Sequence, residues 1–206
     1  MALAIVSTDS GGLPEYPISS VERLDSHFFV AWNLKRWEAS DFRRQAYSDP
    51  EVGFFGRELF DLSHGQSPVG TLPMDAAAQA FLLRMTRDRW EGLCARAFSP
   101  LSGWYPVQCD NGEVRLAHDV VTEVAISALE SSRRNRANAE ARKRAKRLAD
   151  LRDKLEQIGA GHLLKQPNFL DRFNDWLEDH HPDEQRREPL IRSALDAFTM
   201  HQEVRK

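Results

Sequence analysis

The sequence predicts a mainly helical protein with one small β-hairpin. Three observations lead to this fold class. Several stretches carry apolar residues at helical spacing and begin with a capping residue. The stretch "WYPVQCDNGEVRLAHD" alternates apolar and polar residues around an Asn-Gly turn. The run from Asp119 to Ile158 contains neither glycine nor proline, which favours a long helix.

Length and composition bound the classes of protein to consider. At 206 residues the chain suits one compact domain with an appendage, or two small domains. It has no run of about 18 apolar residues, so we expect no membrane span and no membrane partner. Its two cysteines, Cys94 and Cys109, make no disulfide framework, which favours a reducing cytoplasm. Residues 1–25 are rich in Ser, Gly and Pro and predict a disordered leader, because the opening "MALAIV" lacks the features of a signal peptide.

The first elements follow from aromatic residues and a helix cap. The segment His27 to Trp37 is too short for its period to distinguish strand from helix. Its aromatic side chains are expected to anchor the core, namely Phe28, Phe29, Trp32 and Trp37. Asp49 as N-cap and Pro50 in the first turn predict a helix with one apolar face, formed by Val52, Phe55, Leu59 and Leu62. Its glycines, Gly53 and Gly56, permit close packing.

A short strand, two helices and the hairpin come next. We expect a very short strand at Val69 to Leu72 and a helix from Met74 to Met85. Thr86 caps a third helix, whose buried stripe is expected to contain Trp90, Leu93, Cys94 and Ala97. In the hairpin, one strand directs Tyr105, Val107 and Cys109 to one face, and we expect Val114 and Leu116 of the partner strand to lie on the same face. Asn111-Gly112 supplies the left-handed turn residues.

This order of elements is that of a winged helix-turn-helix domain, which we place at residues 26–130. An unspecialised helical domain with one hairpin has the same order and stays open as an alternative. In a winged helix the third helix can enter a DNA major groove, where guanidinium groups suit phosphate oxygens and guanine. The residues predicted to contact DNA here are Arg87, Arg89, Arg96 and Arg115. A salt-bridged surface is the alternative for these arginines.

The strongest charge signal is "SSRRNRANAEARKRAKR", residues 131–147. The chain has 28 basic and 31 acidic residues, and this segment holds eight of the basic and one of the acidic, which leaves 20 basic and 30 acidic residues elsewhere. A local positive patch on an acidic body favours a polyanion at one place. The predicted DNA-binding residues here are Arg133, Arg134, Arg136, Arg142, Lys143, Arg144, Lys146 and Arg147. The alternatives are a solvated helix face and a flexible basic tail.

The remaining chain predicts a basic helical extension over residues 131–158 and a small C-terminal helical module over 159–206. Leucines from Leu148 to Leu155, followed by Ile158, have heptad-like spacing, which permits a homodimer. Helices are expected from Asn168 to His180 and from Pro182 to about Val204. Apolar residues of the first of these could close a small satellite core, or could dock a partner or a second copy.

Several of these motifs together resemble the YdaU-like prophage family, a domain of unknown function. The matching motifs are Phe28-Phe29 with Trp37, Gly53-Phe54-Phe55 after Glu51, "GTLPMD", Trp90, Phe98, Gly112, "RLAHD" and "SSRRNRANAEARKRA". They cover residues from about 28 to 147. The resemblance implies a winged-helix-like, DNA-associated role, often among phage replication genes, and it implies no catalytic residue. This sequence departs from the family at Phe54-Phe55, and residues 148–206 lie outside the resemblance.

The leading hypothesis is therefore a cytoplasmic, phage-derived protein that binds double-stranded DNA, in replication initiation or in transcription regulation. Its C-terminal helices would bind a second copy or a replication or transcription protein. The alternative is a protein-interaction adaptor that uses the winged helix and the C-terminal helices as a docking scaffold.

No enzyme, metal or cofactor is predicted. The adjacent histidines His180 and His181 lie beside acidic residues, but "HHPDE" suits a loop and a helix start better, with Pro182 in the first turn. His118-Asp119 has no nucleophile near it in sequence, and neither a Gly-x-Ser-x-Gly motif nor a phosphate-binding loop occurs. Cys94 is expected to lie in the core.

Overall fold

The computed structural model describes residues 12–24 and 29–203, and the chain divides into two compact units after Arg134. The described part is mainly helical with a small three-stranded antiparallel sheet, which confirms the predicted fold class at this level. None of its helices combines the length and the apolar character needed to cross a bilayer.

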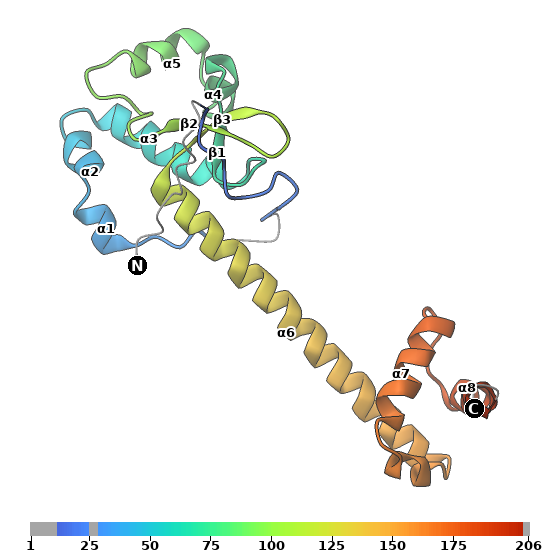
Figure 1. The fold of residues 1–206 in the computed structure, drawn as a ribbon. Coiled ribbons are helices and arrows are strands. Elements are labelled where there is room, and N and C mark those ends of the chain that lie inside the picture. The colour runs from blue at the N-terminus through green and yellow to red at the C-terminus, as the bar shows by residue number, and fades with distance from the viewer. Residues whose placement is uncertain (1–11, 25–28, 204–206) are drawn as a thin grey trace. The chain divides into compact units, whose positions relative to one another are not determined.

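The first unit contains short helices around the sheet (Figure 1). Its elements are α1 (Leu34–Glu38), α2 (Asp41–Ala46), α3 (Pro50–Ser63), β1 (Thr71–Pro73), α4 (Ala76–Leu82), α5 (Arg87–Cys94), β2 (Tyr105–Gln108) and β3 (Val114–Ala117). The predicted caps are confirmed, because the side chain of Asp49 accepts the amide of Val52 and that of Thr86 accepts the amide of Arg89. Helix α5 ends earlier than predicted, so Ala97 is exposed while Trp90 and Leu93 are buried.

The three strands pair in the order β1-β3-β2, with Leu72 opposite Leu116 and Val107 opposite Arg115. The predicted hairpin is present, and Gly112 at its tip has a φ of 84°. The predicted facing of its strands is wrong, because Val114 and Leu116 lie opposite Gln108 and Pro106, whereas Arg115 and Ala117 lie opposite Val107 and Tyr105. Leu116 therefore packs in a different core cluster from Val107. Strand β1 begins at Thr71 and not at Val69. The reason is that Gly70 has a φ of 83°, which interrupts the extended backbone.

The prediction of a disordered leader is wrong for residues 12–24. Tyr16, Ile18 and Leu24 are buried in the same core cluster as Val107. The Tyr16 amide donates to the Gln108 carbonyl, and the Tyr16 hydroxyl donates to the Val69 carbonyl at 2.6 Å. Three apolar side chains and edge pairing with β2 therefore outweigh the Ser, Gly and Pro content. Residues 1–11 lie outside the described part.

The described aromatic residues that were predicted to anchor the core lie nearer the surface than expected. Phe29 is 83% exposed, and Trp32 and Trp37 are half-buried. Trp32 instead packs edge-on against Trp37 and lies under the Arg57 guanidinium, 3.3 Å from the ring centroid. The unit's innermost positions are occupied by other residues, namely Val52, Leu59, Leu72 and Trp90. Phe28 lies outside the described residues.

Gly53 marks the close packing expected of α3 against α2. A Cβ at this position would lie 2.4 Å from the Cβ of Ala46. We expect Gly53→Ala to lower the free energy of unfolding by about 1–3 kcal/mol, because the backbones must separate. Gly92→Ala on α5 is the matched control, since a Cβ there meets nothing within 4 Å. It should raise stability by about 0.5–1 kcal/mol. Urea unfolding measures both, and equal effects of the two changes would contradict the packing argument.

Helix α6 (Asp119–Gln157) begins in the first unit and ends in the second, as the absence of glycine and proline predicts. In the first unit it buries Val121, Ala125 and Leu129. The second unit contains the end of α6, a 3₁₀ turn η1 (Gly161–Lys165), α7 (Phe169–His180) and α8 (Glu188–Glu203).

The second unit has its own core, which confirms the predicted satellite core. Leu151 and Leu155 of α6 pack with Phe173 and Leu177 of α7 and with Ile191 of α8. Leu151 and Leu155 of the heptad-like series therefore pack inside the unit, with Ile158 against them. The last helix begins at Glu188 and not at Pro182, so Pro182 does not occupy a first turn. Contacts of the connecting segment explain this, because Lys154 donates to the Arg186 carbonyl and Arg186 donates to Asn174.

Candidate nucleic-acid interface

The arginines predicted to contact DNA from α5 are paired with the protein's own carboxylates. Arg87 Nε lies 2.7 Å from Glu91 Oε1, one turn further along α5. Arg89 reaches Glu51 of α3 at 2.7 Å. Arg96 follows the helix's C-cap and forms two ion pairs, with Asp49 at 2.8 Å and with Glu51 at 2.6 Å. The salt-bridged surface considered from the sequence is therefore the arrangement present.

Glu51 is the centre of this cluster. Hydrogen bonds from Arg89 and then Arg96 hold the pKa of the Glu51 carboxyl below its usual range. In turn, Glu51 and then Asp49 raise the pKa of Arg96. The arginine side chains stay 56% and 39% exposed, for Arg89 and Arg96 respectively. Exposed ion pairs are weak in water, so an approaching phosphate could compete with Glu51 for both guanidinium groups.

Arg115 of the hairpin is held inside the sheet. Its side chain is 13% exposed. Its Nε donates to the Thr71 hydroxyl at 2.8 Å, and a terminal nitrogen donates to Gln66 at 3.2 Å. Arg115 therefore links β3 to β1 and to the preceding loop, and its guanidinium is engaged within the protein.

The basic segment of α6 contains both paired and unpaired side chains. Arg133 pairs with Glu22 of the N-terminal segment. Arg144 lies 3.1 Å from Asp171 and 2.8 Å from Asp175, both on α7. Arg147 reaches Glu178 at 3.4 Å. Arg144 precedes Leu151 by seven residues and Leu155 by eleven, so it shares the face of α6 that packs against the second unit's core.

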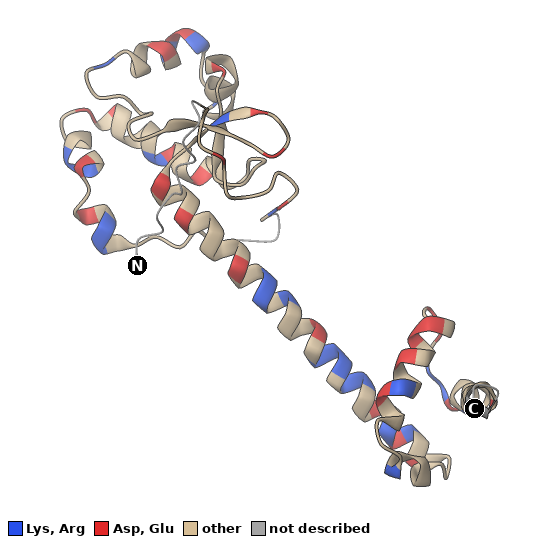
Figure 2. Cartoon of the chain, viewed as in Figure 1, with Lys and Arg blue, Asp and Glu red and all other residues tan. Residues whose placement is uncertain are grey.

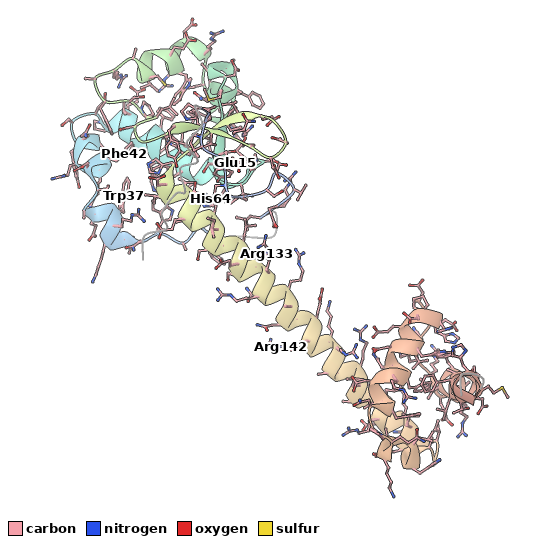
Figure 3. The ribbon with its side chains drawn as sticks, in the orientation of Figure 1. Glu15, Trp37, Phe42, His64, Arg133 and Arg142 are labelled. Carbon is pink, nitrogen blue, oxygen red and sulfur yellow. The ribbon has the colours of Figure 1, made fainter. Side chains whose placement is uncertain are left out.

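Arg134, the last residue of the first unit, is also exposed. The other exposed cations of this segment belong to the second unit and form what we call the free basic face: Arg136, Arg142, Lys143 and Lys146. No carboxylate within the described residues pairs with any of them. Figure 2 shows Lys and Arg gathered along this part of α6, and in Figure 3 Arg142 projects from the helix. Lys146 lies four residues after Arg142 and three after Lys143, so these three side chains share one side of the helix.

The remaining candidates are engaged in structural contacts. The His180 and His181 ring nitrogens Nδ1 bond the Trp176 carbonyl at 2.9 Å and Glu184 at 2.7 Å. No group of three or more His, Cys, Asp or Glu side chains within the described ranges is arranged to hold a metal ion. Burial raises the pKa of the Cys94 thiol and lowers that of the His118 imidazole.

Sequence reasoning left a salt-bridged surface open for α5 but did not identify the acidic partners that lie on other elements. Asp49 is recognisable as a helix cap, but its second role toward Arg96 depends on a contact 47 residues away in sequence. Asp171 and Asp175 are four residues apart on α7, and this spacing is the only sequence sign that they form one acidic face.

Comparisons with known proteins give no match: neither a family model, nor a curated protein, nor a solved structure is similar to this chain. The resemblance to the prophage family stays a prediction from the sequence.

Proposed function

We propose that the protein binds double-stranded DNA through the phosphate backbone. The observation that carries this proposal is the free basic face, where exposed cations have no carboxylate partner among the described residues. Cations without internal partners lose no ion pair when they neutralise phosphates, and counterion release then drives binding. The arginines that already pair with carboxylates would contribute less to the affinity, because each would lose an ion pair on binding a phosphate.

A winged-helix role for the first unit is part of the proposal. Its support is the order α3, β1, α4, α5, β2, β3 together with the strand order β1-β3-β2. Helix α5 would then be the helix next to the major groove. The resemblance to a prophage family favours replication over transcription regulation. A second copy or a replication or transcription protein would bind the C-terminal helices.

The test of the DNA proposal is the salt dependence of affinity for a duplex. The logarithm of the association constant should fall linearly with the logarithm of salt concentration, by about 0.9 for each phosphate neutralised. If each cation of the free basic face neutralises one phosphate, the slope should be about −4. An affinity that does not change with salt would contradict the proposal.

Glu51→Gln tests the part assigned to α5. The change removes the carboxylate shared by Arg89 and Arg96, so we expect duplex affinity to rise several-fold if α5 faces the duplex. Glu58→Gln is the matched control, because it removes the same charge from the same helix. A fluorescence-anisotropy titration measures both. Equal gains would mean that only net charge changed and that α5 does not contact DNA.

A protein-interaction adaptor is the second candidate, and the neutralised arginines of α5 favour it. Exposed aromatic side chains of the same unit could serve such a role, since Tyr47 is 73% and Phe81 82% exposed. Under this alternative the substitutions described above leave duplex binding weak and unchanged.

A further inference from the structure

A small pocket in the second unit is lined by basic side chains from two stretches of the chain. Arg147 and Lys154 come from α6, and Arg186 comes from the segment between α7 and α8. Asp150 and Leu151 complete the lining, and the volume is about 100 Å³. This pocket is separate from the free basic face, because its residues do not belong to that set.

The cations are held in place by the unit's own contacts. Arg186 has a side chain only 19% exposed and donates to the Asn174 amide oxygen at 2.7 Å. Lys154 donates to the carbonyl of Arg186. Glu178 Oε1 forms ion pairs with both guanidinium groups, at 3.4 Å from a nitrogen of Arg147 and 3.7 Å from a nitrogen of Arg186. Lys154 and Arg186 are therefore held close together, and Glu178 brings Arg147 beside them.

The charges around the pocket do not cancel. The positive groups are Arg147, Lys154 and Arg186, and the negative groups are Asp150 in the lining and Glu178 beside it. Burial lowers the pKa of Arg186, Glu178 raises it, and Arg147 lowers it again. An anion in the pocket would offset the repulsion between Arg147 and Arg186.

We propose that the pocket formed by Arg147, Lys154 and Arg186 binds a phosphate group. Guanidinium forks match the geometry of a tetrahedral oxyanion and donate two hydrogen bonds at once. The volume suits a single phosphate, whereas pockets for larger ligands measure roughly 300 Å³ or more. The phosphate belongs either to a nucleic-acid backbone or to a free phosphate compound, and the chemistry of recognition is the same for both.

Calorimetric titration of the full-length protein with inorganic phosphate tests this proposal. We expect saturable binding to one site. Lys154→Gln should weaken it by about tenfold, the effect of one charge-assisted hydrogen bond. Asp150→Asn should tighten it, because the change removes the carboxylate from the lining. Asp150 is exposed and its side chain makes no hydrogen bond or ion pair to a described residue, so the fold should persist, which a thermal midpoint checks.

Lys165→Gln is the matched control, since Lys165 is an exposed lysine of the same unit outside the pocket. It should leave phosphate binding unchanged. No saturable binding in the wild type and in Asp150→Asn, or equal dissociation constants in all variants, would overturn the proposal. Displacement of bound phosphate by a short duplex identifies a backbone phosphate as the ligand, and phosphate binding at saturating duplex identifies a free compound. The pocket does not depend on the proposed DNA binding, because the phosphate titration involves no duplex.

Discussion

Replacing Arg142, Lys143 and Lys146 by Gln is expected to weaken duplex binding by about 500-fold at 0.1 M salt. Each of these cations is exposed and has no carboxylate partner among the described residues. A single phosphate contact contributes nearly a factor of ten at this salt concentration, because the slope per contact is about 0.9. The salt slope should therefore become shallower by about 3.

The matched control removes three positive charges elsewhere, by replacing Arg44, Lys165 and Arg192 with Gln. Arg44 and Arg192 pair with acidic residues of their own helices, Asp41 and Glu188. Since the net charge changes equally, only the long-range attraction is lost, and the slope should stay close to that of the wild type. If both variants lose the same affinity, the free basic face is no binding surface.

The comparison of Arg142 with Arg144 shows why charge alone does not locate the interface. In the sequence the two arginines belong to one basic run and are equivalent. In the structure Arg144 lies between Asp171 and Asp175, whereas Arg142 has no such partner within the described residues. The difference comes from residues 27 or more positions further along the chain, so no local pattern contains it.

Local chemistry explains which elements were predictable. The cap at Asp49, the cap at Thr86 and the turn at Gly112 each depend on a few neighbouring residues, and all three are present. The leader was mispredicted for the opposite reason. Its order depends on Tyr16 and Ile18 packing against strands about 90 residues away, and composition carries no trace of that contact.

Trp90→Ala is expected to lower the free energy of unfolding by about 3–5 kcal/mol, the largest effect on stability that we foresee. Trp90 is fully buried at the centre of the first unit, among Val52, Leu59 and Leu72. Its indole nitrogen donates to Gln79 Oε1 at 2.8 Å, and Gln79 is itself buried. The substitution leaves a cavity and also an acceptor without its donor.

Trp90→Phe separates these two losses. Phenylalanine fills most of the volume of the indole ring but donates no hydrogen bond. The free energy of unfolding should therefore fall by less, about 1–3 kcal/mol. Urea unfolding followed by circular dichroism measures both variants. Because the second unit has its own core around Phe173 and Leu177, its transition should not shift with either change. A single transition that shifts as a whole would show that the two units unfold together. An unchanged midpoint in Trp90→Ala would show that Trp90 does not anchor this core.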